Sequence, residues 1–559
     1  MNWKTILALL LVPLMLVGVG RWAQQQMEES WMSFVEYRTP YAFDLPGGRA
    51  TEPLTDRVVL VLIDGLRVDR AQEMPTLRRL MEEGAYRIAV TGEPSLSYPS
   101  WTVVATGTYQ EISGVITNWY EGQVKVDNVF AAAQRAGLRT VLVGSPGWEM
   151  LFGPWFDEKH VYDKEGSEDP DLDVSRKVVE LARVGKLGDL NLVYFGATDD
   201  VAHAFGGASE EYARAAARID ELLSQVVDAL DPSTTTLVVT SDHGHIDTGG
   251  HGGWEPVVKE VPLILWGRGV KAGSYGGKVG QADIAPTIAA LLGTPHPTHS
   301  TGMVLVEMLD LSEDQRASRL AAVADVQAAF TREYVAFHRG EEPQLEVSEE
   351  DPARLLDEAA SLRESARAAH LATGRWARFP SAVAVLLVIL ALAYLALRHP
   401  GRVRTLAGIA TYFVLYNLLF FGRGYRYSLS VFNEEAYIMD FFNSRLMDAA
   451  ACLVLAAAVT ALLVAWRRRH TVRELVWTVE AMSLGVFALL ALQALWMYYT
   501  WGFAYEWYLP DLRPAFKFYL DLLQMVATGF AAVIAPLVGL LVGKIIATLV
   551  PPPGRAVRG

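Results

Sequence analysis

The sequence has very few cysteines and few charged side chains. Cys452 is the one cysteine among 559 residues. A disulfide framework and a cysteine-based metal site are therefore excluded, and any metal site must use histidine and carboxylate ligands. Charged residues make up only 20% of the chain, whereas hydrophobic residues make up 51%. This composition is too apolar for a simple soluble or disordered chain, and it predicts a membrane part.

Acidic residues outnumber basic ones in the first two thirds of the chain. The segment from Pro380 to the end carries 15 Lys+Arg and 9 Asp+Glu, a net charge of +6. Because the whole chain has a net charge of −14, the first 379 residues carry −20. Nucleic-acid binding depends on clustered Lys and Arg that neutralise phosphates, and a front part of this charge excludes it.

Apolar runs near both ends predict six membrane spans. A span needs about 20 apolar residues, and five stretches in the last third approach or reach this length: 381–397, 405–421, 449–466, 475–496 and 522–543. A sixth run, 5–20, follows Lys4. It is short enough for a cleaved signal peptide, but no clear Ala-x-Ala site follows it, so an uncleaved anchor is favoured.

The loops between these runs differ in charge, which predicts their orientation. Basic residues follow the second, fourth and sixth spans, and we expect those loops and both termini to be cytoplasmic. These residues are Arg398, Arg402, Arg404, Arg467, Arg468, Arg469, Arg473, Lys544, Arg555 and Arg558. About 350 residues between the first two spans would then lie outside the cytoplasm.

Short apolar runs alternate with helical patterns in this external part. The runs 58–63, 140–143, 190–195 and 235–240 are typical of buried strands, and 75–84, 126–136 and 210–230 of helices. This alternation predicts an α/β fold, a mostly parallel sheet with helices on both faces. The predicted organisation is an anchor at 1–24, a linker at 25–56, a catalytic domain at 57–310, juxtamembrane helices at 311–378 (312–339 and 351–372) and a transmembrane bundle at 379–559.

Carboxylates and imidazoles follow three of the predicted strands. Ligands in such sheets gather at the carboxyl ends of the strands, and the residues there are Asp64, Asp199, His203, Asp242 and His243, with His251 in a Gly-rich segment. Asp199 and His203 are four residues apart, which places them on one helical face. Mixed imidazole and carboxylate ligands favour Zn²⁺, with Mn²⁺ as the alternative, and two such ions can act together in phosphoryl transfer.

Four motifs occur in order with these residues: LVLIDGLRVD, PSLSYPSWTVVATG, SDHGHIDTGGHGGWEPVVKEVPLILWGRG and ADIAPTIAALLG. Over residues 57–305 the chain resembles the alkaline phosphatase superfamily, in particular its nucleotide pyrophosphatase/phosphodiesterase and GPI ethanolamine-phosphate transferase branches. The resemblance implies two divalent ions, one held by Asp64, Asp242 and His243 and the other by Asp199, His203 and His251.

The resemblance also implies a nucleophile and a phosphate-binding residue. Ser97 stands where the family has its metal-bridging hydroxyl, with Ser95 as the alternative, and Asn118 stands where phosphodiesterase relatives keep a phosphate-binding amide. His245 departs from the family, and it either lines the substrate pocket or is exposed. Trp101 replaces the Arg of a sulfatase signature, which weakens that alternative.

The expected reaction begins with attack of Ser97 on a phosphorus centre. Water as the second acceptor would make the protein a phosphodiesterase or nucleotide pyrophosphatase on soluble substrates. A sugar or lipid hydroxyl would make it a phosphotransferase, possible donors being phospholipids such as one with a phosphoethanolamine headgroup. The tether at both ends and the large bundle favour a lipid-linked substrate in the bilayer. A lipid transport module with a non-catalytic outer domain is the alternative of a different class.

Overall fold

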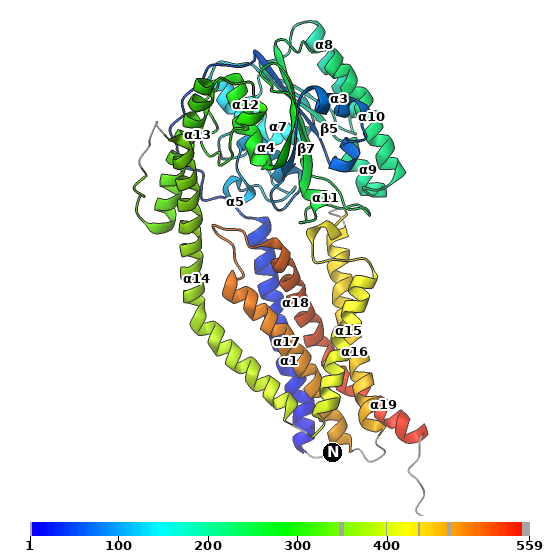
Figure 1. The fold of residues 1–559 in the computed structure, drawn as a ribbon. Helices are drawn as coiled ribbons and strands as arrows, with labels where there is room; N and C mark the ends of the chain where they lie inside the picture. Colours follow the sequence, from blue (N-terminus) through cyan, green and yellow to red (C-terminus); the bar gives the residue numbers. More distant parts are fainter. Residues whose placement is uncertain (1–2, 346–350, 399, 434–436, 467–470, 550–559) are drawn as a thin grey trace, which may run out of the picture.

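The computed structural model has two parts, an α/β domain and a bundle of long helices below it (Figure 1). We call the α/β domain the external domain because it stands outside the bundle. It describes residues 3–345, 351–398, 400–433, 437–466 and 471–549. Arg467, Arg468, Arg469, Arg555 and Arg558, which contribute to the predicted orientation, lie outside these ranges.

One eight-stranded sheet forms the centre of the external domain. Its strand order is β4-β3-β5-β1-β6-β7-β2-β8, and β7 alone runs against the others. The strands are β1 (Arg57–Ile63), β2 (Ala85–Val90), β3 (Thr140–Gly144), β4 (Glu158–Val161), β5 (Leu190–Phe195), β6 (Thr235–Thr240), β7 (Glu260–Gly267) and β8 (Gly273–Gly280). The predicted fold class, a mostly parallel sheet covered by helices, is confirmed.

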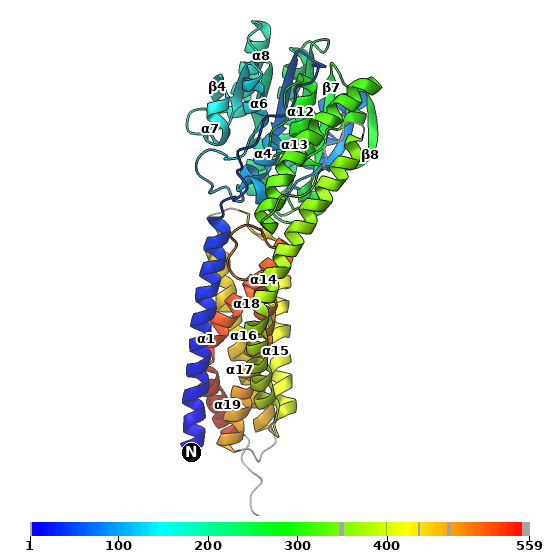
Figure 2. The same cartoon turned by 90° about the vertical axis from the view of Figure 1, so that its left-hand side faces the viewer.

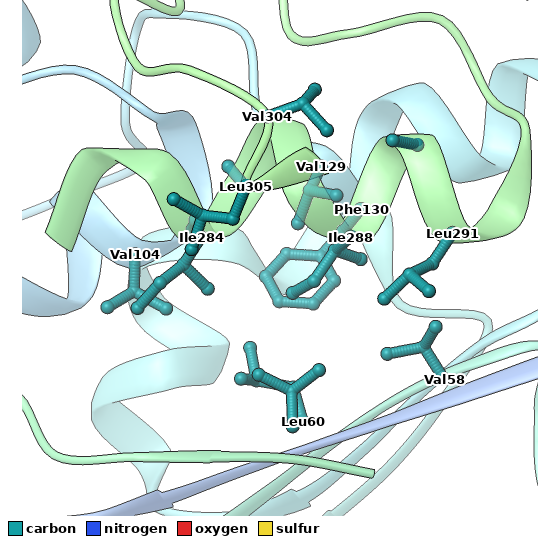
Figure 3. Packing of buried hydrophobic residues seen from close by; sticks show 14 of the residues in the cluster. Val58, Leu60, Val104, Val129, Phe130, Ile284, Ile288, Leu291, Val304 and Leu305 are labelled. Atoms are coloured by element: carbon teal, nitrogen blue, oxygen red, sulfur yellow. The ribbon is translucent and has the colours of Figure 1, made fainter. Parts of the chain in front are cut away.

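The central strand β1 is apolar throughout because both of its faces are buried. Val58 and Leu60 pack against α4 (Ser97–Thr106), α6 (Val129–Arg135) and α12 (Ile284–Leu292), as Figure 3 shows. Val59 and Val61 face α3 (Pro75–Glu83), α8 (Pro170–Arg183) and α10 (Glu210–Asp228) on the other side. Full burial of such a side chain contributes about 1.5–3 kcal/mol, so the central strands hold the domain together.

The strand register brings three chain segments to one edge of the sheet. Ile63 of β1 pairs with Phe195 of β5, and Leu62 pairs with Thr240 of β6. The residues that follow these strands therefore begin at the same level. The amide of Asp64 donates to the carbonyl of Phe195 at 2.9 Å, which continues the pairing by one step.

The helices of the lower part have the length and hydropathy of membrane spans, and the chain is an integral membrane protein. Within the described residues these are α14 (Pro352–Leu397), α15 (Arg402–Gly422), α16 (Ile438–Ala465) and α17 (Val472–Thr500), and a pair, α18 (Leu512–Ala531) and α19 (Ala535–Leu549), counts as a fifth. The two helices of the pair meet at a bend of 54°, which lies within the stretch 522–543 predicted as one span.

Helix α14 also differs from the sequence prediction. The predicted juxtamembrane helix 351–372 and the span 381–397 form one continuous helix of 46 residues, with Pro380 inside it. Its upper half packs on α13 (Glu313–Arg339) and its lower half on α17. Arg378 supports the junction, because its guanidinium donates to the carbonyls of Tyr499 and Thr500.

The predicted N-terminal anchor segment lies within helix α1 (Trp3–Val35). This helix runs the length of the bundle beside α18 and reaches the external domain with its C-terminal end (Figure 2). Both the first helix and the bundle therefore extend to the lower edge of the external domain.

Candidate active site

Three strand ends deliver the predicted carboxylates to one place. Asp64 follows β1, Asp242 lies two residues after β6, and α9 (Ala197–Phe205), the helix after β5, carries Asp199 and His203. The carbonyl of Asp64 accepts from Thr198 Oγ1 at 2.6 Å, and its neighbour Gly65 donates its amide to Asp242 Oδ1 at 3.0 Å. These hydrogen bonds fix the three loops relative to one another.

The first half of the site is made of Asp64, Asp242 and His243. The Nε2 atom of His243 lies 3.5 Å from Asp64 Oδ1 and 3.4 Å from Asp242 Oδ2. All three side chains are buried, with 0–2% of their surface exposed. One oxygen of each carboxylate and the imidazole Nε2 thus converge on a single point, and the group could hold a metal ion.

The second half contains Asp199, His203 and His251. His203 Nε2 lies 3.2 Å from His251 Nε2 and 3.4 Å from Asp199 Oδ2, and His251 Nε2 lies 3.9 Å from Asp199 Oδ1. The structure brings all six sequence-predicted ligand residues together, since the rings of His243 and His251 are stacked with centroids 3.8 Å apart.

His245 is part of the same cluster, which the sequence prediction left open. The side chain is fully buried, so the exposed alternative is wrong. Its Nε2 lies 2.7 Å from Asp199 Oδ1, and it could be a ligand together with Asp199, His243 and His251. The alternation of His243 and His245 after a buried strand was the only local signal for this contact.

Hydrogen bonds at Nδ1 fix the tautomers of the three predicted ligand histidines. His243 donates to the carbonyl of Gly244 at 3.3 Å, and His251 donates to that of Ser95 at 3.1 Å. A carbonyl can only accept, so Nδ1 carries the proton and the Nε2 lone pair faces the cluster. His203 Nδ1 lies 3.3 Å from Asn433 Oδ1. Such outer partners orient metal-binding imidazoles in proteins.

The charges in the cluster fit a divalent cation. Burial and the neighbouring carboxylates of Asp242 and Asp199 raise the pKa of Asp64 well above its usual range, and burial raises the pKa of Asp242 to about 6. Asp64 Oδ1 is buried and, among the described residues, has no hydrogen-bond partner. A cation at this point would offset the repulsion and occupy the free oxygen. Burial lowers the pKa of His243 to about 3, so this imidazole is neutral, as a ligand must be.

Ser97 begins α4 and points at the first half of the site. Its Oγ lies 3.3 Å from His243 Nε2, and the residue is 8% exposed. Ser95, the alternative nucleophile, instead donates its Oγ to the carbonyl of Gly253 at 2.9 Å. The geometry therefore favours Ser97 over Ser95 as the attacking hydroxyl.

Two aromatic side chains donate hydrogen bonds to the carboxylates of the first half. Trp101 Nε1 donates to Asp242 Oδ2 at 2.8 Å, and the hydroxyl of Tyr194 donates to Asp64 Oδ2 at 2.7 Å. Trp101, which the sequence prediction treated only as a departure from a sulfatase motif, thus holds a candidate ligand. The position of Tyr194 inside a buried strand gave no sign of this role.

A cavity of about 310 Å³ opens beside the second half of the site. Asn118 lines it, and its Oδ1 accepts from the amide of Tyr98 at 3.0 Å, so its amide nitrogen is free to donate elsewhere. The other lining residues come from the external domain, from α1 and from the bundle: Trp31, Phe34, Leu96, Thr117, Trp119, His203, His251, Leu429, Phe432, Asn433 and Ile438.

Comparison with known proteins agrees with this architecture. The family model "Type I phosphodiesterase / nucleotide pyrophosphatase" matches residues 58–267. The human GPI ethanolamine phosphate transferase 1 is 27% identical over 314 residues, which cover 46% of this chain and 33% of the relative. The catalytic subunit of human GPI ethanolamine phosphate transferase 2 is 29% identical over 284 residues, covering 46% and 28%. The alignments thus span about a third of the length of these curated relatives.

Among solved structures, the murine ectonucleotide pyrophosphatase/phosphodiesterase 5 aligns with a TM-score of 0.37 and 15% identity, over 43% of this chain and 96% of its own. The alkaline phosphatase PafA aligns with a TM-score of 0.40 and 12% identity, over 46% and 100%. Residues 58–267 therefore match the type I phosphodiesterase/nucleotide pyrophosphatase family, in a chain similar over about half its length to GPI ethanolamine phosphate transferases.

Proposed function

We propose that this protein transfers a phosphoethanolamine group from a membrane phospholipid to a hydroxyl acceptor, by way of a covalent phospho-Ser97 intermediate. The similarity to the GPI ethanolamine phosphate transferases and the matched phosphodiesterase domain support this class of reaction. The proposal includes two divalent cations, with Zn²⁺ the best match to the mixed imidazole and carboxylate ligands.

The observation that carries the lipid assignment is the composition of the cavity at the metal cluster. Its lining combines polar side chains, among them Asn118, His203 and His251, with apolar ones such as Trp31 and Phe34 of helix α1. A smaller apolar cavity of about 60 Å³ shares Trp31, Phe34 and Leu429 and continues between α1, α17 and α18. A ligand with a phosphate headgroup and an apolar body fits a mixed cavity that adjoins an apolar one.

Each proposed residue has a distinct role in the reaction. Asp64, Asp242 and His243 would hold one cation, and Asp199, His203 and His251 the other, with His245 beside Asp199. Bound cations would lower the pKa of the Ser97 hydroxyl and offset charge on the phosphoryl oxygens. Asn118 would donate its amide to one of those oxygens and so orient the phosphorus toward Ser97.

The group transfer takes place in two displacements. In the first, Ser97 Oγ forms a bond to phosphorus, the bond to the diacylglycerol oxygen breaks, and that oxygen leaves with a proton. In the second, the acceptor oxygen forms a bond to phosphorus, the bond from phosphorus to Ser97 Oγ breaks, and the proton of the acceptor hydroxyl goes to Ser97 Oγ. Water in place of the acceptor would give hydrolysis, which the name of the matched family favours as the second candidate.

The proposed topology places the external domain outside the cytoplasm and both termini inside it. Among the described residues, Arg398, Arg402, Arg404, Arg473 and Lys544 support this orientation by their positions at one end of the bundle. The proposed boundaries are those expected from the sequence, a catalytic domain at 57–310 and a bundle from 379.

Full-length protein in liposomes with headgroup-labelled phosphatidylethanolamine tests the proposal. Diacylglycerol together with a labelled acceptor supports transfer, and free phosphoethanolamine supports hydrolysis. Cleavage of a nucleotide diester in place of the lipid would favour the second candidate. Protein that cleaves neither the lipid nor the nucleotide diester, with Zn²⁺ or with Mn²⁺, and so behaves like Ser97→Ala, would contradict phosphodiester chemistry and favour a lipid transport module.

A further inference from the structure

A segment of the transmembrane bundle lies directly on the Gly-rich part of the candidate site. The outer loop, residues 423–433, connects α15 to the part of the chain that leads into α16. Ser430 Oγ accepts the amide of Gly253 at 3.1 Å and donates to Glu255 Oε2 at 2.8 Å. Ser428 Oγ donates to the same carboxylate oxygen at 3.0 Å. The carboxylate of Glu255 is buried, so these hydrogen bonds hold the outer loop firmly.

The glycines around His251 permit this close approach. A Cβ atom at Gly253 would lie 1.9 Å from Ser428 Oγ, and one at Gly250 would lie 2.4 Å from the carbonyl oxygen of Ser430. Gly249 has φ +89°, and a Cβ there would lie 2.6 Å from Asn433 Oδ1. The Gly-rich sequence thus serves contact with the bundle in addition to the turn that positions His251.

Asn433 makes two hydrogen bonds to His203. Its amide nitrogen donates to the backbone carbonyl of His203 at 2.5 Å, and its Oδ1 faces His203 Nδ1 at 3.3 Å. The carbonyl can only accept, which fixes the amide with nitrogen toward the backbone and oxygen toward the ring. Asn433 Oδ1 therefore accepts the Nδ1 proton, which leaves His203 Nε2, beside His251 and Asp199, as the nitrogen that can bind a cation.

We infer that Asn433 is a positioning residue through which the transmembrane bundle completes the metal-binding half formed by Asp199, His203 and His251. His243 and His251 donate their Nδ1 protons to carbonyls of the external domain, at Gly244 and Ser95. His203 alone among these three uses an acceptor about 230 residues away, on the outer loop. The inference rests on the proposed metal site, and it assigns to the bundle a part in forming that site beyond anchoring.

The test compares Zn²⁺ affinities of full-length protein in detergent, measured by competition with a chromogenic chelator. Loss of an outer partner of a metal-binding histidine typically lowers metal affinity 10–100-fold. We expect Asn433→Leu to weaken one of two bound ions by this factor and to leave the other unchanged. Asn433→Asp keeps an oxygen acceptor for Nδ1, and we expect it to retain most of the affinity. Arg426→Ala, an exposed position on the same loop, is the matched control and should bind like the wild type.

A second variant separates positioning from simple docking of the loop. Ser430→Ala removes an anchor of the outer loop without touching His203, so it should weaken the ion less than Asn433→Leu does. The absorption spectrum of the Co²⁺-substituted protein gives an independent readout, because it changes only if the ligands of the bound ion change.

Three results would overturn the inference. In the first, Asn433→Leu binds two ions with wild-type affinity and gives a wild-type Co²⁺ spectrum, which leaves the proposed function intact. In the second, Ser430→Ala loses as much affinity as Asn433→Leu, so that Asn433 only docks the loop. In the third, wild-type protein binds no divalent ion, and the proposed function falls with the inference. Thermal unfolding of each variant, compared with wild type, shows whether a loss of affinity reflects a misfolded protein.

Discussion

The two halves of the His/Asp cluster differ in what holds them. Asp64, Asp242 and His243 are at most 2% exposed and take their supporting hydrogen bonds from the sheet and from α4 of the external domain. The side chains of Asp199 and His203 are 17% and 24% exposed, and His203 is hydrogen-bonded to Asn433 of the outer loop. The first half is thus part of the folded core, whereas the second half lies at the boundary between the two parts of the molecule, beside the cavity.

The electrostatics of the two halves differ in the same sense. Burial and like charges raise the pKa of Asp64, so its ionised form is destabilised when no cation is present. Burial also acts to raise the pKa of Asp199, but hydrogen bonds from His203 and His245 outweigh it and hold that pKa well below its usual range. One half therefore needs a cation to balance its charge, and the other is partly balanced by its own imidazoles.

Replacement of the proposed nucleophile should give the largest effect while it leaves both halves intact. We expect Ser97→Ala to lower phosphoethanolamine transfer by about 10³-fold or more, since the covalent step is lost. Zn²⁺ affinity should stay within a few-fold of wild type, because six imidazole and carboxylate ligands remain. Headgroup transfer and bound zinc are measured on the same preparation, with Ser95→Ala as the control. Turnover that survives in Ser97→Ala and is lost in Ser95→Ala would reassign the nucleophile.

Isosteric removal of one charge from each half should change stability in opposite directions. Asp64→Asn removes a carboxylate whose pKa is raised, keeps the hydrogen bond from Tyr194, and should raise the unfolding temperature of metal-free protein at pH 7. Asp199→Asn removes a carboxylate whose pKa is lowered and should reduce it.

Both variants should bind Zn²⁺ more than about 100-fold more weakly than wild type, a loss beyond that typical of outer partners. Calorimetry of chelator-treated protein gives the unfolding temperatures. Equal shifts of the same sign in the two variants would show that the halves do not differ in the way described.

A methyl group at the interface should affect only the second half. In Gly253→Ala the new Cβ would meet Ser428 and displace the outer loop, and overpacking of this kind costs about 1–3 kcal/mol. We expect the affinity for the ion of the second half to fall roughly 10-fold and the affinity for the ion of the first half to stay unchanged. The unfolding temperature should be lower. Gly276→Ala is the matched control, because a Cβ there meets nothing within 4 Å. A lower affinity for the ion of the first half instead would contradict the assignment of the outer loop to the second half.

Loss of a single supporting hydroxyl should give the smallest effect, and only in the first half. Tyr194→Phe removes the hydrogen bond to Asp64 Oδ2, and we expect a decrease in affinity for one ion of about 10-fold, the lower end of the range for such partners. Titration with Zn²⁺ measures it, and Tyr86→Phe, whose hydroxyl accepts from Gln72, serves as the control. An unchanged affinity would mean that Tyr194 only fills space.

The two halves of the cluster also differ in how much of each the sequence could predict. Strands β1, β5 and β6 are continuous apolar runs, so their ends, and with them Asp64 and Asp242, follow from local pattern. Strand β7 is an apolar run, but it contains Pro262, which argues against a central strand, and β8 is rich in glycine and lacks the pattern of a buried strand. Both were missed, together with β2 and the mostly polar β4.

The second half was predictable only in part. The spacing of four between Asp199 and His203 is a local property of one helix turn, and it places both on the same face. The contact of His203 with Asn433 joins residues 230 positions apart, and no periodicity within either segment encodes it. The burial of His245 likewise depends on how β6 and α9 meet in space.

The 46-residue helix α14 links the external domain to the bundle as one uninterrupted element. At 1.5 Å per residue it is about 69 Å long, and a bilayer core takes up roughly 30 Å of this. Close to 40 Å of helix therefore stands beyond the hydrocarbon as a fixed spacer and not as a slack tether. In the proposed reaction, an acceptor would have to present its hydroxyl at the level of the outer loop that contacts His203, so the reach of a lipid's headgroup would decide which membrane molecules can be modified.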